Sequence, residues 1–222
     1  MFSKMGNGMQ LGVIIGSVSE RVGTNNLDNL EIILRHGPGH IYPPHLVPYK
    51  SHVQTLKASG VTDVIAVSTV GSLSESVKPR TFCIPDQLLD FTKCRESTFS
   101  STGNVVHPFM WEPFNASLRD MLVTILRRLD CPVTVGGTYV CIEGPRFSTK
   151  AESRMFASLG GTIIGMTACP EAYLAREAGL EYALLCCVTD YDGSTNFEGI
   201  RQASKTFGSQ IGDILTELNR QE

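Results

Sequence analysis

The sequence lacks the patterns that mark several common classes of protein. It has no GxxxxGKS or GxxxxGKT phosphate-binding loop, and no GxGxxG follows its first predicted strand, which argues against a dinucleotide site. It has no run of like charges, and its formal net charge is only -3. No apolar run reaches membrane-spanning length, and LGVII near the start is too short for the apolar core of a secretory signal. Neither nucleic acid nor a membrane is therefore expected as a partner.

The seven cysteines follow no disulfide or metal-binding pattern. Their number is odd, there is no CxxC pair, and no histidine stands at zinc spacing. Cys186 and Cys187 adjoin inside an apolar run. Reduced, packed thiols in a cytoplasmic protein are the interpretation that this usage favours. No metal site is expected.

Apolar segments that alternate with helical patterns dominate what the sequence does contain. Hydrophobic residues make up 42% of the 222, which is enough for a sizeable core. Strands are predicted at 11–15, 30–34, 61–68, 82–91, 133–142, 162–166 and 182–188. Helices are predicted at 47–60, 115–129, 147–161, 170–179 and 198–219. This alternation predicts an α/β fold in a single domain, residues 1–222, with a mixed, largely parallel central sheet flanked by helices.

Three of the predicted helices carry capping signals. Asn115 precedes the helix at 115–129, and Gly179 lies just past the helix at 170–179. Thr149 and Glu152 have the spacing of a capping box. These signals fix where the helices begin and end more closely than periodicity alone.

Polar side chains follow five of the predicted strands at their carboxyl ends. The five clusters are Gly16 with Ser17, Arg35 with His36, Ser68 with Thr69, Met166 with Thr167, and Asp190 with Asp192. Ligands of open α/β sheets bind beyond the carboxyl ends of the strands. The five clusters are therefore expected to share one site.

Two of these clusters suit an anion. Arg35 offers a planar fork of donors that matches phosphate or carboxylate oxygens. The hydroxyls of Ser68 and Thr69, with nearby backbone N–H groups, could hold an oxyanion. Each cluster alone also fits a simpler interpretation, namely a surface arginine beside a loop histidine, or an ordinary turn.

Aromatic and acidic residues form the other candidates. Phe147 follows Gly-Pro at a helix start, where it could stack on a flat ring or serve as a hydrophobic staple. Asp190 and Asp192 stand two residues apart on an extended segment, so both point the same way. If buried, one of them could hold a proton near neutral pH and act as a general acid. A Mg²⁺ or Ca²⁺ site and a polar loop tip are the alternatives, and no third hard ligand lies nearby.

A series of motifs in fixed order spans nearly the whole chain. They are GVIIGS, LRHGPGH, VIAVSTVGSLSE, PDQLLDFT, HPFMWEPF, GGTYVCIEGPRFSTKAES and IIGMTACPEAYLAREAGLEYALLCCVTDYD. In this order they resemble the trimeric purine nucleoside phosphorylase family, and within it the branch that acts on 5′-methylthioadenosine. The pair IEGPRFS…AES and MTxxPExxLAxEAG is the most specific part of the resemblance.

This resemblance implies a nucleoside phosphorylase fold and a reaction. The reaction is phosphorolysis of 5′-methylthioadenosine to adenine and 5-methylthioribose 1-phosphate, in purine and methionine salvage. Inorganic phosphate is then the co-substrate, with no cofactor and no metal, and the enzyme is a cytoplasmic homotrimer. The alternatives are phosphorolysis of inosine, guanosine or methylthioinosine, a hydrolase that uses water, and a degenerate nucleoside-binding relative with little turnover.

The resemblance also implies residue roles. Met166 lies against the ribose, and Phe147 stacks on the purine. Asp190 reaches N7 as the general acid, and Asp192 accepts from the 6-amino group. His107 reaches into a neighbouring subunit's pocket near the 5′ substituent. The implied phosphate contacts are Ser17, Arg35, His36, Ser68, Thr69 and Thr167.

The chain departs from the family pattern in two places. The connection between residues 18 and 34 is shorter than is usual. Ile15-Gly16-Ser17 stands where the family has Gly-Gly-Thr, and Ser68 stands where threonine is common. A weaker or remodelled phosphate site is therefore expected.

Overall fold

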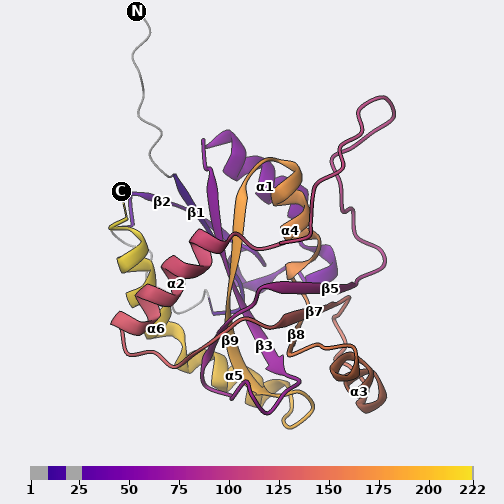
Figure 1. Cartoon of the computed structure of the whole chain (residues 1–222), viewed down its shortest axis with the longest axis vertical. Coiled ribbons are helices and arrows are strands. Elements are labelled where there is room, and N and C mark those ends of the chain that lie inside the picture. Colours follow the sequence, from indigo (N-terminus) through magenta and orange to yellow (C-terminus); the bar gives the residue numbers. More distant parts are fainter. Residues whose placement is uncertain (1–9, 19–26, 222) are drawn as a thin grey trace, which may run out of the picture.

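A computed structural model describes residues 10–18 and 27–221, and one nine-stranded sheet forms its centre (Figure 1). The strands are β1 (Leu11–Ile15), β2 (Leu30–Leu34), β3 (Asp63–Ser72), β4 (Phe82–Ile84), β5 (Gln87–Phe91), β6 (Val133–Val135), β7 (Thr138–Ile142), β8 (Ile163–Gly165) and β9 (Glu181–Tyr191). Their order is β5-β7-β8-β3-β9-β4-β6, and β1 pairs with β3 and β2. Among the paired strands of the described residues, only β3–β8 and β4–β9 are antiparallel. The predicted α/β class with a mixed, largely parallel sheet is confirmed.

Helices cover both faces of the sheet. They are α1 (Tyr49–Ala58), α2 (Ala116–Arg128), α3 (Lys150–Ser158), α4 (Ala168–Glu177), α5 (Phe197–Thr206) and α6 (Gly208–Leu218). Val64 and Ala66 of β3 pack in the cluster that holds α1 and α4, whereas Ile65 and Val67 pack in the cluster that holds α2 and α6. Successive side chains of a strand point to opposite faces, so one apolar strand supplies both cores.

The predicted helix ends are confirmed where a capping signal was present. The Asn115 side chain accepts a hydrogen bond from the backbone of Leu118 at 2.9 Å. Thr149 and Glu152 form a complete capping box at the start of α3. Gly179 follows α4 with a φ of 73°. Local side-chain chemistry therefore set these boundaries.

Three predicted elements are wrong in extent, because each is two elements. The strand predicted at 82–91 divides at Pro85 into β4 and β5, which lie in different parts of the sheet, and proline cannot donate to a ladder. The strand at 133–142 divides where Gly136 and Gly137 have φ values of 88° and 115°. The helix at 198–219 divides at Phe207, whose buried ring packs edge-on against Phe82.

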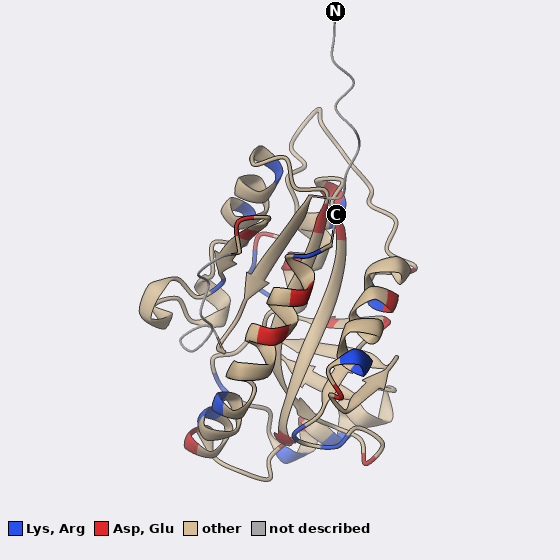
Figure 2. Ribbon diagram, turned by 90° about the vertical axis from the view of Figure 1, so that its left-hand side faces the viewer, with Lys and Arg blue, Asp and Glu red and all other residues tan. Residues whose placement is uncertain are grey.

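The ribbon of Figure 2 marks charged residues of both signs on helices and loops. Within the described residues, no helix has the length and apolarity needed to cross a membrane. The shortened connection expected between residues 18 and 34 falls partly on residues 19–26, which lie outside the described residues. That expectation, and the extent of the domain over residues 1–222, stay predictions.

Candidate active site

A cavity of about 650 Å³ lies at the carboxyl ends of the central strands. Every predicted site residue except His107 lines it: Ser17, Arg35, His36, Ser68, Thr69, Phe147, Met166, Thr167, Asp190 and Asp192. The cavity has the size of a typical small-molecule site. Segments that are far apart in the sequence therefore meet around one ligand-sized space, as the strand-end argument predicted.

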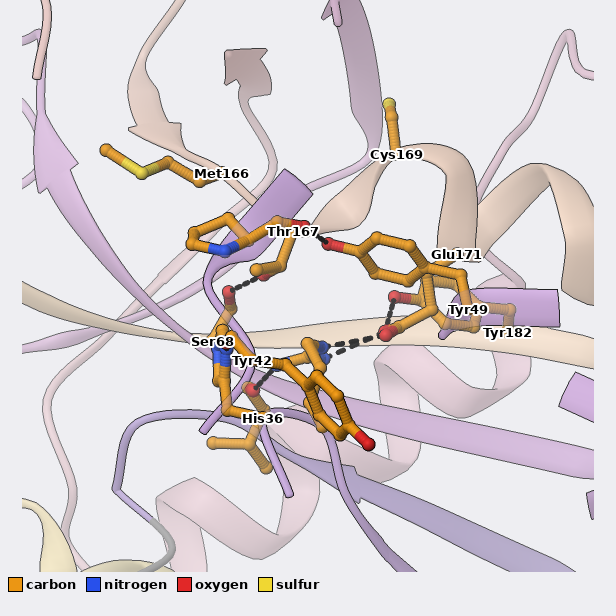
Figure 3. Close-up of polar contacts among 12 residues, drawn as sticks. His36, Tyr42, Tyr49, Ser68, Met166, Thr167, Cys169, Glu171 and Tyr182 are labelled. Atoms are coloured by element: carbon orange, nitrogen blue, oxygen red, sulfur yellow. Dashed lines mark hydrogen bonds and ion pairs between the residues drawn. The ribbon is translucent and has the colours of Figure 1, made fainter. Parts of the chain in front are cut away.

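Arg35 follows β2 directly and is fully buried. Its Nε and Nη2 donate to the two carboxylate oxygens of Glu171 at 2.7 and 2.8 Å, and its Nη1 donates to the carbonyl of Val67 at 2.7 Å (Figure 3). Burial by itself would lower the pKa of Arg35, but the charge of Glu171 and its hydrogen bonds more than reverse this effect. The interpretation of Arg35 as a surface arginine is therefore wrong, because the side chain is a buried cation held beside the cavity.

Gly16 leaves the space that the guanidinium of Arg35 occupies. A Cβ on Gly16 would lie 2.6 Å from Nη1 of Arg35 and 2.9 Å from the carbonyl oxygen of Val67. Only glycine allows this close approach without displacing the arginine. The preceding Ile15, which departs from the family pattern, is fully buried in the apolar core and is not among the lining residues. Its bulk therefore leaves the cavity free.

His36 is held as a neutral imidazole. Its Nδ1 lies 2.8 Å from the carbonyl oxygen of Tyr42, which can only accept, so Nδ1 carries the hydrogen. Its ring stacks on His40 with the centroids 4.1 Å apart. Burial, and then the charge of Arg35, lower the pKa of His36 to about 4. At neutral pH, Nε2 is therefore an unprotonated acceptor.

Ser68 and Thr167 bring two hydroxyls together on the same side of the cavity. Their side-chain oxygens lie 2.8 Å apart, and both residues are buried (Figure 3). Ser68 belongs to β3, and Thr167 is the residue before α4. We call the side formed by Ser17, Arg35, His36, Ser68, Thr69 and Thr167 the anion side. It combines one fixed positive charge with several hydroxyls, which suits a small oxyanion.

Asp190 lies within β9, which runs three residues beyond the predicted strand. Only 7% of the residue is exposed, so the interpretation as a polar loop tip is wrong. Burial raises the pKa of Asp190; a hydrogen bond with Thr189 opposes this rise, and the charge of Asp192 adds to it. The carboxyl group is therefore placed to hold a proton at higher pH than an ordinary aspartate.

The hydroxyl of Thr189 suits both protonation states of Asp190. Its oxygen lies 2.7 Å from Oδ1 of Asp190 and 3.1 Å from the carbonyl oxygen of Val70. A hydroxyl has one hydrogen to donate. An ionised Asp190 accepts that hydrogen, whereas a protonated Asp190 can donate to Thr189 while Thr189 donates to Val70.

Asp192 faces the same cavity from the turn after β9. Its backbone N–H donates to the carbonyl of Ser72 at 2.8 Å, and the hydroxyl of Ser153 donates to its carboxylate. Within the described residues, no group of three or more His, Cys, Asp or Glu side chains is arranged to hold a metal ion. The acidic pair is therefore available to a ligand that carries N–H donors.

Phe147 lines the cavity and is 47% exposed. The interpretation as a core residue is therefore wrong. The interpretation as a hydrophobic staple is wrong as well, because Thr149 is the N-cap of α3 and a staple uses the residue directly before the N-cap. We call the side formed by Phe147, Ser148, Asp190 and Asp192 the base side. The hydroxyl oxygen of Ser148 is buried without a hydrogen-bond partner in the described structure. Sequence reasoning missed Ser148, and its place directly after Phe147 was the only signal.

Arg95 supports the wall that carries Met166, and sequence reasoning missed it as well. Its Nη1 donates to the backbone carbonyls of Met166 and Cys169 at 2.8 and 2.5 Å, and its Nε donates to Glu143 at 3.1 Å. The α5 helix forms another unforeseen wall, with five lining residues: Phe197, Ile200, Arg201, Ser204 and Lys205. Neither feature has a local sequence signal, because both depend on contacts over long stretches of chain.

His107 does not join the cavity of its own chain. It is exposed on the segment between β5 and α2, which projects from the body at the upper right of Figure 1. Phe109 and Trp111 on the same segment are 78% and 79% exposed. The role of His107 in a neighbouring subunit's pocket stays a prediction.

Residues 18–219 match the family model described as the phosphorylase superfamily. The chain is 46% identical over 171 residues to S-methyl-5′-thioadenosine phosphorylase of Nitrosopumilus maritimus, an alignment that covers 77% of this chain and 65% of that protein. It is 48% identical over 179 residues to the enzyme of the same name from Pyrococcus furiosus, covering 80% and 69%. The alignments therefore span about two thirds of the relatives' length.

Solved structures agree with these relatives. A mutant of adenosine/methylthioadenosine phosphorylase from Schistosoma mansoni, in complex with methylthioadenosine, superposes with a TM-score of 0.86 at 30% sequence identity. The match covers 95% of this chain and 90% of that one. Methylthioadenosine phosphorylase from the same organism in complex with adenine matches equally well, with a TM-score of 0.86.

Proposed function

Because this chain belongs to the phosphorylase superfamily, we propose that it is a pentosyltransferase that cleaves 5′-methylthioadenosine with inorganic phosphate. The products are adenine and 5-methylthioribose 1-phosphate. The observation that carries the proposal is one cavity that joins the anion side to the base side, with Arg35 on one and Asp190 on the other. Relatives that are 46% to 48% identical bear the name of this activity.

The anion side holds the attacking phosphate. Arg35 supplies the fixed positive charge. Hydrogen-bond donors on short side chains come from the hydroxyls of Ser17, Ser68, Thr69 and Thr167. The phosphate oxygen attacks the anomeric carbon while the bond from that carbon to the purine breaks. Fixing the phosphate beside the sugar converts a bimolecular attack into a positioned one, and the phosphate charge stabilises the positive charge that develops on the ribose. Met166 lies against the ribose.

The base side stabilises the leaving purine. As the glycosidic bond breaks, its electron pair moves into the purine, and N7 becomes more basic. Asp190 donates its proton to N7, so the purine leaves as a neutral molecule. Phe147 stacks on the ring, and Asp192 accepts from the 6-amino group. The raised pKa of Asp190 supports this role, because the acid must be protonated when substrate binds.

The acidic pair favours adenine over 6-oxopurines. A carboxylate that faces a 6-oxo group would bury two acceptors against each other, which costs about 1–3 kcal/mol. Inosine, guanosine and methylthioinosine are therefore the poorer substrates. A hydrolase would have no use for the buried Arg35 cation, and a degenerate binder would not need an acid held ready at Asp190.

The assembly is a homotrimer, in which His107 reaches a neighbouring subunit's cavity near the 5′ substituent. The exposed Phe109 and Trp111 on the same segment support an interface there. No metal or organic cofactor takes part; phosphate is the co-substrate. The enzyme is cytoplasmic, which its seven free cysteines support.

The test is adenine release from 5′-methylthioadenosine, with and without phosphate, and with inosine as the comparison substrate. The proposal expects release that depends on phosphate, formation of a sugar 1-phosphate, and little turnover of inosine. Release that is equal without phosphate would identify a hydrolase. Preferred turnover of inosine would overturn the base assignment, and nucleoside binding without turnover would identify a degenerate relative.

A further inference from the structure

Glu171 is a fully buried carboxylate next to the cavity, and the reaction steps above do not use it. It belongs to α4, and both of its oxygens accept from Arg35, at 2.7 and 2.8 Å (Figure 3). We infer that Glu171 is a positioning residue for phosphate, because it fixes the guanidinium of Arg35 in the one orientation that presents its remaining donors. This inference rests on the proposed function, since the phosphate site is part of that proposal.

The donors of Arg35 can be counted. A guanidinium has five N–H bonds, one on Nε and two on each Nη. Glu171 takes one from Nε and one from Nη2, and Val67 takes one from Nη1. One N–H on Nη1 and one on Nη2 are left beyond these three hydrogen bonds. Two donors on neighbouring nitrogens match two oxygens of one phosphate in a bidentate pair.

The ion pair between Arg35 and Glu171 fixes the orientation of the guanidinium as well as pairing its charge. The two parallel hydrogen bonds to Glu171 define the plane of the guanidinium, and the third to Val67 prevents rotation in that plane. Tyr182 donates its hydroxyl to Glu171 at 2.8 Å, which in turn fixes the carboxylate. Burial and the charge of Glu171 raise the pKa of Tyr182 well above its usual value, so its hydroxyl remains a donor.

The same helix positions two parts of the anion side. Thr167 is the residue before α4, and Glu171 lies four residues later, beyond Cys169, whose backbone is extended rather than helical. Thr167 contacts Ser68 of β3, and Glu171 contacts Arg35 after β2. The start of α4 therefore sets the distance between the hydroxyls and the cation that share the phosphate.

The matched tests are Glu171→Asp, which keeps the charge but withdraws the carboxylate, and Tyr182→Phe, which removes only the hydroxyl that holds it. Glu217→Asp is the control. Glu217 is also a buried carboxylate, and it pairs with Arg128 and Arg220 at 2.6 Å, but it is not among the residues that line the cavity. It therefore reports the general effect of shortening a carboxylate in an ion pair.

We expect Glu171→Asp to raise the KM for phosphate about tenfold, the loss of one charge-assisted hydrogen bond, while the KM for methylthioadenosine is nearly unchanged. Tyr182→Phe should raise the phosphate KM only about threefold, because the hydrogen bond that it removes holds the Glu171 carboxylate and lies one contact further from phosphate. The control should leave both constants unchanged. A purely structural role would lower the amount of folded enzyme without altering the phosphate KM.

A second readout does not need turnover. Phosphate should raise the melting temperature of the wild-type protein and raise that of Glu171→Asp much less, whereas adenine should stabilise both equally. If the wild-type protein shows this phosphate effect without turnover, the proposed function fails while the positioning role is supported. An equal phosphate KM and an equal phosphate effect in wild type, Glu171→Asp and Tyr182→Phe would overturn the inference. If Glu171→Asp does not fold, Tyr182→Phe alone decides between the two results.

Discussion

Replacing Asp190 by asparagine tests the base side most directly. The amide has nearly the same shape as the carboxyl group and can still donate an N–H bond to N7, but it cannot transfer a proton. Because Asp190 is only 7% exposed, water has little access to take over its role. The variant therefore removes the acid while it leaves the cavity in place.

The expected loss follows from the role of a general acid. Proton transfer by a positioned acid contributes about 10²- to 10⁴-fold. Because the amide keeps a hydrogen bond to N7, we expect the lower end, about a hundredfold loss of kcat for methylthioadenosine, or about 2.7 kcal/mol. The loss should be smaller for 6-oxopurine nucleosides, because an amide can donate to O6. The ratio of the two activities should therefore move toward the 6-oxopurines.

The pH dependence gives a second measure. Wild-type kcat/KM should fall as the pH rises through the raised pKa of Asp190, and Asp190→Asn should lack that fall. Asp192→Asn is the matched control, because it should change the preference for the 6-amino group while it keeps the alkaline fall. The phosphate dependence of both proteins, measured over the same pH range, separates the ionisation of phosphate itself.

The Asp190→Asn substitution should raise the thermal stability of the protein at neutral pH, although it lowers the activity. A folded pKa above the unfolded value means that the native state favours the protonated carboxyl; the stability it contributes is present at low pH and is lost as the pH rises through the folded pKa. The amide does not titrate. Asp190→Asn should therefore melt at a higher temperature than wild type at neutral pH, and the difference should shrink in acid. An unchanged substrate ratio together with an unchanged pH profile would refute the role assigned to Asp190.

Three further changes test the other parts of the cavity. Arg35→Ala should weaken phosphate binding and lower the free energy of unfolding by about 3–5 kcal/mol, because Glu171 stays buried without its charged partner. Phosphate titration and urea unfolding measure the two effects, and an unchanged phosphate affinity would remove Arg35 from the site. Gly16→Ala should raise the phosphate KM about tenfold, because the Cβ of the new alanine would lie 2.6 Å from Nη1 of Arg35 and displace it. An unchanged KM would mean that Arg35 can move without weakening phosphate binding. Phe147→Ala should raise the KM for methylthioadenosine about tenfold, because the stacking on the purine is lost. The melting temperature should change little, because the residue is 47% exposed. A large fall in melting temperature with an unchanged KM would make Phe147 a structural residue.

Many of the cavity residues could be predicted from the sequence, because they lie at or near the carboxyl ends of strands. A strand that ends at the carboxyl edge of a parallel sheet brings the next polar residues to the same edge as its neighbours. Arg35, which directly follows β2, is found where this rule places it, whereas Ser68 and Asp190 lie inside β3 and β9, which run further than predicted. Helix ends with capping residues, such as Asn115, were equally predictable because capping is local chemistry.

The contacts that bury and orient these residues depend on the tertiary structure. In the sequence, Glu171 stands in the motif MTACPEAYLAREAG, but nothing local shows that it is fully buried while Glu177 of the same helix is not. Its burial against Arg35, 136 residues away, depends on how α4 packs against α1 and β9. The division of 82–91 into two strands in different parts of the sheet likewise depends on partners far along the chain. Strand periodicity and capping are local, so they predict from the sequence which polar side chains lie near the carboxyl ends of strands. Only the fold decided their charge, orientation and support, because burial and ion pairing arise from contacts between distant segments.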